Sequence, residues 1–157
     1  MAFSLEMDIK ATVEIVVSRD KALSMKPEEY REYITSVNPD KLIFKEGCSL
    51  DDCTKFVLRK VLPFRQAEKV MNKQMEVKNG KPKINLSYIM EEIRASLIDI
   101  INPINCANPL EFKRGSDGMA SEELIAGIHG AGVLMDLFSG RTSSVSSAND
   151  EELGKKN

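Results

Sequence analysis

Near the N-terminus, apolar and polar residues alternate along Phe3-Ser4-Leu5-Glu6-Met7-Asp8-Ile9-Lys10-Ala11-Thr12-Val13-Glu14-Ile15-Val16-Val17. Every odd position of this stretch is apolar, and every even position except Val16 is polar. A period of two is typical of a β-strand with one apolar face and one solvent-exposed face. At about 3.3 Å per residue the stretch would reach roughly 50 Å, which is far longer than a usual strand. We therefore expect it to bend, to carry a bulge, or to pair at one end with another subunit.

Helix and strand signals follow this first strand. A proline at position 27, followed by Glu28 and Glu29, predicts the start of a short helix, and Asn38-Pro39 predicts its end. Residues 41–45 and 55–61 each carry apolar side chains at alternate positions, which predicts two strands. Because a polar loop lies between them, we expect a hairpin with a long loop.

Apolar residues spaced three and four apart predict three further helices. The first begins at Pro63, and a turn at Asn79-Gly80-Lys81-Pro82 follows it. The second begins near Asn85 or Ser87 and ends at Asn102-Pro103, with Glu91, Glu92, Arg94 and Asp99 on its outer face. The third follows a loop over residues 102–118, begins near Ser121 and carries an apolar side as far as Met135.

This order of elements predicts an α+β fold. We expect a single domain over residues 1–138, with a β-rich part (1–61, the long strand plus the hairpin) and a helical part (62–138). Residues 139–157 are rich in serine and in charged residues. Such a composition cannot bury a core, so we expect a disordered polar tail.

Bulk composition excludes some classes of function. The 157 residues are 42% apolar and 29% charged, with a formal net charge of −2. No strongly basic field is present, so we expect no binding to nucleic acid or to a membrane surface. The N-terminal alternation differs from the continuous apolar stretch of a signal peptide, and no segment predicts a transmembrane helix. An odd number of cysteines favours a reducing compartment, so we expect a cytoplasmic protein.

Four residues have the side chains that a metal or catalytic site needs, namely Cys48, Cys53, Cys106 and His129. Their spacing differs from the common zinc patterns, which place ligands in close pairs. His129 is the only histidine and has no acidic partner nearby in the sequence. A nucleophile pair of Cys106 with His129 stays open as an alternative. We expect no catalytic residue, no metal and no cofactor.

Glycines cluster within the third predicted helix, at positions 127, 130 and 132. Their spacing is not that of a dinucleotide-binding loop, because the segment follows a helical pattern rather than a strand. Ala126 with Gly130, and Gly127 with Ala131, place small residues one helical turn apart, which lets a neighbouring helix approach closely. Each helical glycine costs about 1 kcal/mol relative to alanine, so the cluster indicates tight packing or a helix completed on assembly.

The two ends of the chain carry a family resemblance. The segments Met1-Ala-Phe-Ser-Leu5 and Ile9-Lys-Ala-Thr-Val-Glu-Ile15, with the closing Gly154-Lys155-Lys156-Asn157, resemble tail assembly chaperones of long-tailed bacteriophages. The resemblance covers roughly the first 17 residues and the last few. It implies a non-enzymatic protein that coats the tape-measure protein and recruits tail-tube subunits. In that family a ribosomal frameshift often gives a longer form, and no catalytic residues carry over.

We therefore expect an assembly protein that self-associates and binds protein partners, with tail-tube and tape-measure proteins as the suspected ones. A long amphipathic strand can add to a partner's sheet, and small residues can receive a partner helix. The alternatives are a structural virion component such as an adaptor or ring subunit, an inhibitor of a host protein, and a small enzyme using Cys106 or His129. The candidate partner-binding residues are Leu5, Met7, Ile9, Val13, Gly127, Gly130 and Ala131.

Overall fold

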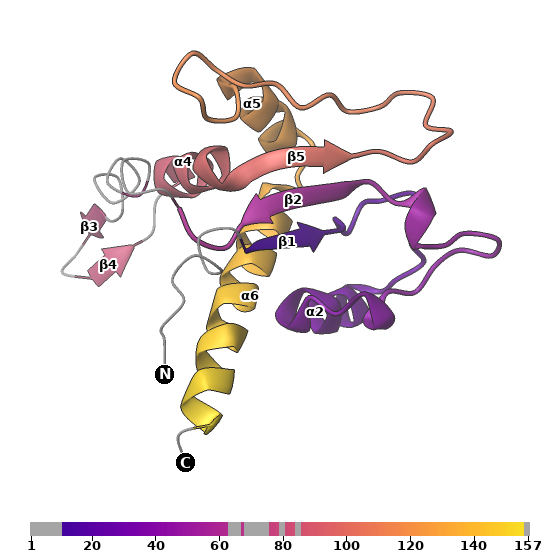
Figure 1. Ribbon diagram of the computed structural model, residues 1–157, viewed down its shortest axis with the longest axis horizontal. Coiled ribbons are helices and arrows are strands. Elements are labelled where there is room, and N and C mark those ends of the chain that lie inside the picture. The colour runs from indigo at the N-terminus through magenta and orange to yellow at the C-terminus, as the bar shows by residue number, and fades with distance from the viewer. Residues whose placement is uncertain (1–10, 63–66, 68–75, 79–80, 84–85, 156–157) are drawn as a thin grey trace, which may run out of the picture.

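A three-stranded antiparallel sheet lies at the centre of the fold (Figure 1). The structure is a computed structural model, and it describes residues 11–62, 67, 76–78, 81–83 and 86–155. The strands are β1 (Thr12–Ile15), β2 (Lys55–Arg59) and β5 (Leu97–Ile101), in the spatial order β1-β2-β5. The alternation predicted for the N-terminal stretch is confirmed in β1, where Val13 and Ile15 are buried while Thr12 and Glu14 are exposed. The described part of the strand spans four residues, and residues 3–10 lie outside the described residues.

Four helices of the described residues accompany the sheet. They are α2 (Pro27–Ser36), α4 (Leu86–Ser96), α5 (Glu122–Gly130) and α6 (Leu134–Lys155). Two short 3-10 helices, η1 (Pro39–Lys41) and η2 (Leu50–Asp52), and a small hairpin of β3 (Glu76–Lys78) with β4 (Lys81–Lys83) complete the described elements. The fold is mixed α+β, as the sequence predicts.

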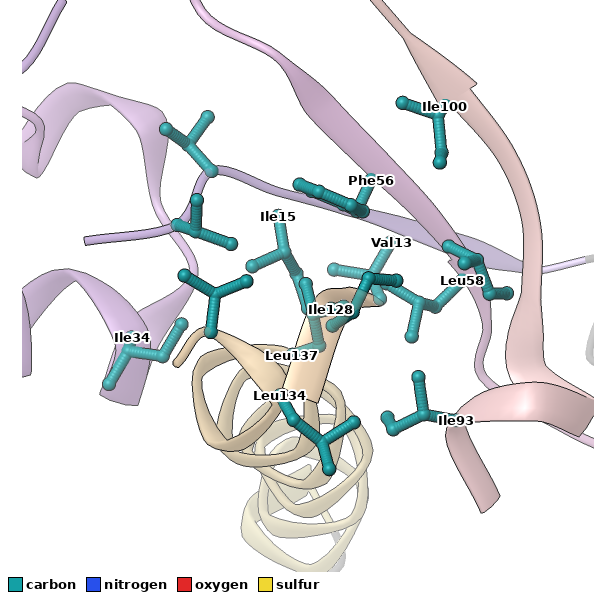
Figure 2. Close-up of a cluster of buried hydrophobic side chains, with 14 of the residues drawn as sticks. Val13, Ile15, Ile34, Phe56, Leu58, Ile93, Ile100, Ile128, Leu134 and Leu137 are labelled. Atoms are coloured by element: carbon teal, nitrogen blue, oxygen red, sulfur yellow. The ribbon is translucent and has the colours of Figure 1, made fainter. Parts of the chain in front are cut away.

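The larger of two clusters of buried hydrophobic residues lies between the sheet and the helices. Figure 2 shows Ile34 of α2, Ile93 of α4 and the two leucines of α6 facing strand residues. In the sheet, Val13 lies opposite Leu58 and Ile15 lies opposite Phe56, and all four are buried. Burying such side chains stabilises a fold by about 1.5–3 kcal/mol each. The predicted helix at Pro27 is confirmed, and its buried face carries Tyr30, Tyr33 and Ile34.

Helix α6 approaches the core closely at Gly140. A methyl group at this position would lie 2.7 Å from Cδ1 of Ile15 and 2.9 Å from Cδ1 of Ile34. Such distances are shorter than van der Waals contact, so a side chain at position 140 would force the side chains of Ile15 and Ile34 to shift. Gly140 lies in the segment predicted to be a disordered tail, and no local pattern in the sequence indicates this contact.

Two tyrosines of α2 hold the end of β1. The backbone N–H of Val16 donates to the Tyr33 hydroxyl at 3.0 Å, and the Tyr30 hydroxyl donates to the Val16 carbonyl at 2.8 Å. Val16 is buried directly after β1, the outer strand of the described sheet, and no other described strand pairs with its backbone groups. Because buried backbone groups need partners, the hydroxyls replace the missing strand.

The prediction of one continuous helix ending at Asn102 is wrong for its second half. The helix stops at Ser96, and Leu97–Ile101 continues as β5, paired with β2. Leu97 and Ile100 are both buried although they are an odd number of positions apart, because the register shifts there and Ile98 forms a bulge. Buried residues three positions apart also occur along one face of a helix, which explains why a helix was predicted here. Arg94, expected on the outer face, is buried.

The predicted hairpin of residues 41–45 with 55–61 is also wrong. Strand β2 is present, but it pairs with β1 and β5. Residues 43–45 instead lie antiparallel to residues 22–24. The backbone N–H of Ser24 donates to the carbonyl of Ile43, and the N–H of Lys45 donates to the carbonyl of Ala22. Between these two hydrogen bonds, Leu23 and Phe44 form an isolated β-bridge. Asp20 directs this turn, because its carboxylate accepts from the backbone N–H groups of Ala22 and Thr54.

The division into a β-rich part and a helical part does not describe the fold. Strand β5 comes from the second half of the chain and completes the sheet, while α2 comes from the first half. The disorder predicted from residue 139 is contradicted for residues 139–145, which belong to α6 and include the buried Arg141 and Ser144. Figure 1 shows its C-terminal half extending past the sheet and α2. The helix predicted from Pro63 falls almost entirely outside the described residues.

We expect Gly140→Ala to lower the free energy of unfolding by about 1–3 kcal/mol, because the added methyl group would overpack the contact with Ile15 and Ile34. The matched control is Gly127→Ala in α5, where an added methyl group meets nothing within 4 Å. Removing a helical glycine there should stabilise the chain by up to about 1 kcal/mol. Urea denaturation of both variants measures the two effects. Equal effects of the same sign would contradict the close approach of α6.

Ionisation of the tyrosines is expected to lower the stability of the folded protein at alkaline pH. Burial raises the pKa of all three tyrosines, Tyr30, Tyr33 and Tyr88, above the usual value of 10. A raised pKa in the folded state means that stability is intact below pH 10 and declines above it, where the unfolded chain ionises its tyrosines. We expect the tyrosinate absorbance of the folded protein to rise only at a pH above 10. A separate tyrosine titration near pH 10 in the folded protein would contradict this.

Candidate interaction surface

Arg94 of α4 fixes the start of α5. Its guanidinium is buried, and its Nε donates to the carbonyl of Ala120 at 2.8 Å. Its Nη2 donates to both carboxylate oxygens of Asp117, at 2.9 and 3.2 Å. Two glutamates lie farther from Nη1, Glu91 at 3.5 Å and Glu122 at 4.0 Å. Because a buried arginine needs such partners, the loop before α5 and the first turn of α5 are held against α4.

The carboxylate of Asp117 is stabilised in its ionised form. The backbone N–H of Met119 donates to it at 3.1 Å, and this bond, together with the Arg94 guanidinium, holds the pKa of Asp117 below its usual value. The helix then begins with Ser121 as its N-cap, since the Ser121 hydroxyl accepts from the N–H of Leu124 at 3.2 Å. The predicted start of this helix is confirmed.

Helix α5 has a buried face and an exposed face. Leu124, Ile125 and Ile128 belong to the core. The opposite side carries Ala126, Gly127 and Gly130, with Ala131 directly after the helix, and all four are exposed. We call these four residues the small-residue strip. No described part of the chain packs closely on Gly127 or Gly130, because a methyl group added at either position would meet nothing within 4 Å. Of the two predicted roles, tight contact or assembly, the described fold therefore leaves the second as a prediction.

The junction between α5 and α6 is held from the other side by the segment after β1. Gly132 has a φ of +77°, which ends α5, and the Arg19 guanidinium lies so close that a methyl group on Gly132 would be 3.1 Å from it. In the first turn of α6, Asp136 accepts from both the N–H and the hydroxyl of Ser18, at 3.0 and 2.7 Å. The small-residue strip therefore lies on a helix whose two ends are both anchored.

The glycines of the strip have no role that the described fold explains. Neither Gly127 nor Gly130 has a positive φ, so the backbone at these positions accepts any L-residue. Neither glycine makes room for a neighbouring group. A glycine inside a helix costs about 1 kcal/mol relative to alanine. The surface therefore has the shape that a second helix needs for a close approach.

The other predicted partner-binding residues have different outcomes. Val13 is only 9% exposed and faces the core, so its predicted role as a partner-binding residue is wrong. It pairs with Leu58 inside the sheet, which leaves no apolar surface there for a partner. Leu5, Met7 and Ile9 lie outside the described residues.

The sulfur-bearing candidates and the histidine are distributed over different elements. Cys53 is buried after η2, Cys48 and Cys106 are half-buried in loops, and His129 is exposed on α5. Burial raises the pKa of the Cys53 thiol to about 12, so this thiol is protonated at neutral pH. Within the part of the chain that is described, no group of three or more His, Cys, Asp or Glu side chains could hold a metal ion.

A second buried arginine was missed because the sequence places it among serines. Arg141 of α6 donates through Nε to the carbonyl of Arg59 at 2.7 Å and through Nη2 to the carbonyl of Lys60 at 3.2 Å. Its Nη1 donates to Glu92 of α4 at 2.9 Å. One side chain thus joins the end of β2, α4 and α6. The lone Arg in a Ser-rich segment gives no periodic signal that would have identified it.

Comparisons of the chain with protein-family models, with curated proteins and with solved structures gave no match. Among the described helices, none is both long and apolar enough to cross a membrane.

Replacing Arg94 tests how α5 is anchored. We expect Arg94→Met to lower the free energy of unfolding by about 1.5–3 kcal/mol, because the buried Ala120 carbonyl and Asp117 lose a charged donor. Arg31→Met is the control, since Arg31 is exposed on α2 and its replacement should change stability by less than about 0.5 kcal/mol.

The effect of Arg94→Met should also depend on pH. A lowered pKa means that Asp117 contributes stability above the usual value of 3.8, and this contribution is lost as the pH falls through its lowered pKa. The difference between the wild type and Arg94→Met should therefore shrink in acid. Urea denaturation at neutral and acidic pH measures it, and a difference that grows in acid would contradict the ion pair.

Proposed function

We propose that this chain is a non-enzymatic assembly protein, namely a tail assembly chaperone of a long-tailed bacteriophage. It binds the tape-measure and tail-tube proteins, self-associates, and acts in the cytoplasm of the host cell. The resemblance of the two chain ends to that family supports the assignment to phage tails. The structure supports the more general part, which is binding to other proteins.

The observation that carries the proposal is the small-residue strip on α5. Its residues are exposed, they are unexplained by the fold, and they lie on a helix anchored by Arg94 at one end and by Ser18 with Asp136 at the other. A rigid surface loses little conformational entropy on binding. Met135, which is 51% exposed just after the strip, adds a flexible apolar side chain of the kind that suits adaptable interfaces.

The side chains that could act as catalytic groups in an enzyme have other roles in this fold, which favours a protein-binding function. The Cys53 thiol is protonated at neutral pH and donates toward the Ser49 carbonyl within the core. His129 is exposed on the same helix as the strip, where it is available to a partner. The ionised carboxylate of Asp117 is used to hold α5 in place. These groups stabilise the fold or border the binding surface.

We expect Gly127→Glu to weaken binding to the tape-measure and tail-tube proteins by at least about tenfold, because a charge and three extra carbons would separate two closely packed helices. Binding is measured with purified proteins by isothermal titration calorimetry. The matched control is Thr35→Glu, an exposed position on α2 that adds the same charge away from the strip. Both variants should remain folded, since both positions are exposed.

Two results would contradict parts of this proposal separately. Wild-type protein that binds neither tail protein would exclude the chaperone function, and its recovery in finished particles would then favour a structural virion component. If the tail proteins bind Gly127→Glu and the wild type equally well, the chaperone function remains supported, but the small-residue strip is excluded as the binding surface.

A further inference from the structure

Strand β5 is an outer strand of the sheet. In the order β1-β2-β5, strand β2 pairs with one side of β5, and no described strand lies on its other side (Figure 1). An outer strand of this kind offers backbone N–H and carbonyl groups with which a strand of another chain can pair. Folded proteins therefore carry features at such edges that block the pairing.

The side chains of β5 favour pairing with a copy of the same strand. Four of the five residues are aliphatic, namely Leu97, Ile98, Ile100 and Ile101. Short segments with high β-propensity, low charge and no proline pair readily with copies of themselves. The fifth residue, Asp99, lies at the centre of the strand, is exposed, and carries the only charge in it.

The hydrogen bonds of β2 indicate which way its backbone groups point. In an antiparallel sheet, successive residues of a strand direct their N–H and carbonyl groups to opposite sides. Lys60, directly after β2, bonds toward β1, since its N–H donates to the Ala11 carbonyl at 3.0 Å. Every second residue counted back from Lys60 therefore bonds toward β1, and the residues between them, including Val57, bond toward β5.

Ile100 is therefore a residue of β5 whose backbone faces outward. Val57 lies opposite Asp99, so Asp99 directs its backbone groups toward β2, and Ile100 directs its own away from β2. The Asp99 carboxylate accepts a hydrogen bond from this outward N–H of Ile100, with 2.8 Å between Oδ1 and N. A side chain of the same strand thus already occupies the donor that a further strand would need.

Irregular backbone on both sides of Ile100 shortens the outer edge further. The register with β2 shifts at Ile98, which forms a bulge, and Asn102-Pro103 follows the last residue of β5. Bulges and prolines both interrupt the row of backbone groups with which another strand could pair. The regular part of this edge is therefore centred on Ile100, where the Asp99 carboxylate lies.

We propose that Asp99 closes the outer edge of β5 against strand pairing with a second copy of this chain. Without the carboxylate, the β5 strands of two copies would pair antiparallel about Ile100, and the two Ile100 residues would exchange N–H to carbonyl bonds. In the wild type this pairing would displace both carboxylates from their N–H groups and bring two like charges close together. The inference goes beyond the proposed function, because it concerns an edge that stays unpaired while the chain binds its partners elsewhere.

The test compares three variants of the purified full chain with the wild type. Asp99→Val removes the carboxylate and its charge, and valine suits an exposed strand position. The matched control, Glu111→Val, makes the same change of charge and side chain at an exposed loop position outside the described strands. A double variant, Asp99→Val with Ile101→Lys, returns a charge to β5 at a position that is 41% exposed. Sedimentation velocity measures self-association, and urea denaturation checks that each variant is folded.

We expect Asp99→Val to self-associate at least about tenfold more tightly than the wild type, and the double variant and Glu111→Val to match the wild type. In the associated Asp99→Val protein, the amide hydrogen of Ile100 should exchange with solvent at least about tenfold more slowly than in the wild type, because it then lies between two strands. All variants should unfold near the wild-type urea concentration, since the three changed positions are exposed.

Four results would overturn this role of Asp99. They are an Asp99→Val protein that sediments as the wild type does, equal association of Glu111→Val, association that persists in the double variant, and association without slower exchange at Ile100. All four are measured on the purified chain alone, so they are distinct from failure of the chaperone function. A wild type that binds no tail protein would exclude that function and leave the role of Asp99 unchanged.

Discussion

The packing of α6 against β1 and α2 at Gly140 is the contact on which the other parts of the structure depend. Because position 140 has no side chain, the helix lies directly on Ile15 and Ile34. That short distance brings Arg141, the next residue, to the end of β2, where its guanidinium reaches two backbone carbonyls and Glu92 of α4. The first turn of the same helix holds the segment after β1 through Asp136. The sheet, two helices and the junction with α5 are therefore all positioned by one helix.

The local signals in the sequence predicted single elements well and their partners poorly. The alternation around Val13 and Ile15, the proline and glutamates that start α2, and Ser121 as an N-cap all act within a few residues, and each is confirmed. The pairing of β2 with β5 depends on a bulge at Ile98, which has no signature of its own. The burial of Arg94 and Arg141 depends on acceptors that are far away in the sequence, so both arginines resembled ordinary surface residues.

The candidate surface was predicted in part, for a physical reason. Small residues one helical turn apart can be recognised from spacing alone, so Gly127, Gly130 and Ala131 were identified. Whether such a face turns toward the core or toward solvent depends on the tertiary packing, and the structure shows that it is exposed. The alternating stretch is longer than a usual strand, which is why a partner was predicted for Val13. The described part of that strand ends after Ile15, and tyrosine hydroxyls form hydrogen bonds with the backbone N–H and carbonyl of Val16.

The bonds from Ser18 to Asp136 join residues that are 118 positions apart. Arg141 likewise reaches back 82 positions to Arg59. A chain with such distant contacts must close large loops before its native interactions can form, which slows folding. During synthesis, the apolar face of β1 and β2 lacks the cover of α6 until residues 134–145 have been made. The newly made N-terminal half is then vulnerable to strand pairing with other chains, and rapid completion of the C-terminal helix protects it.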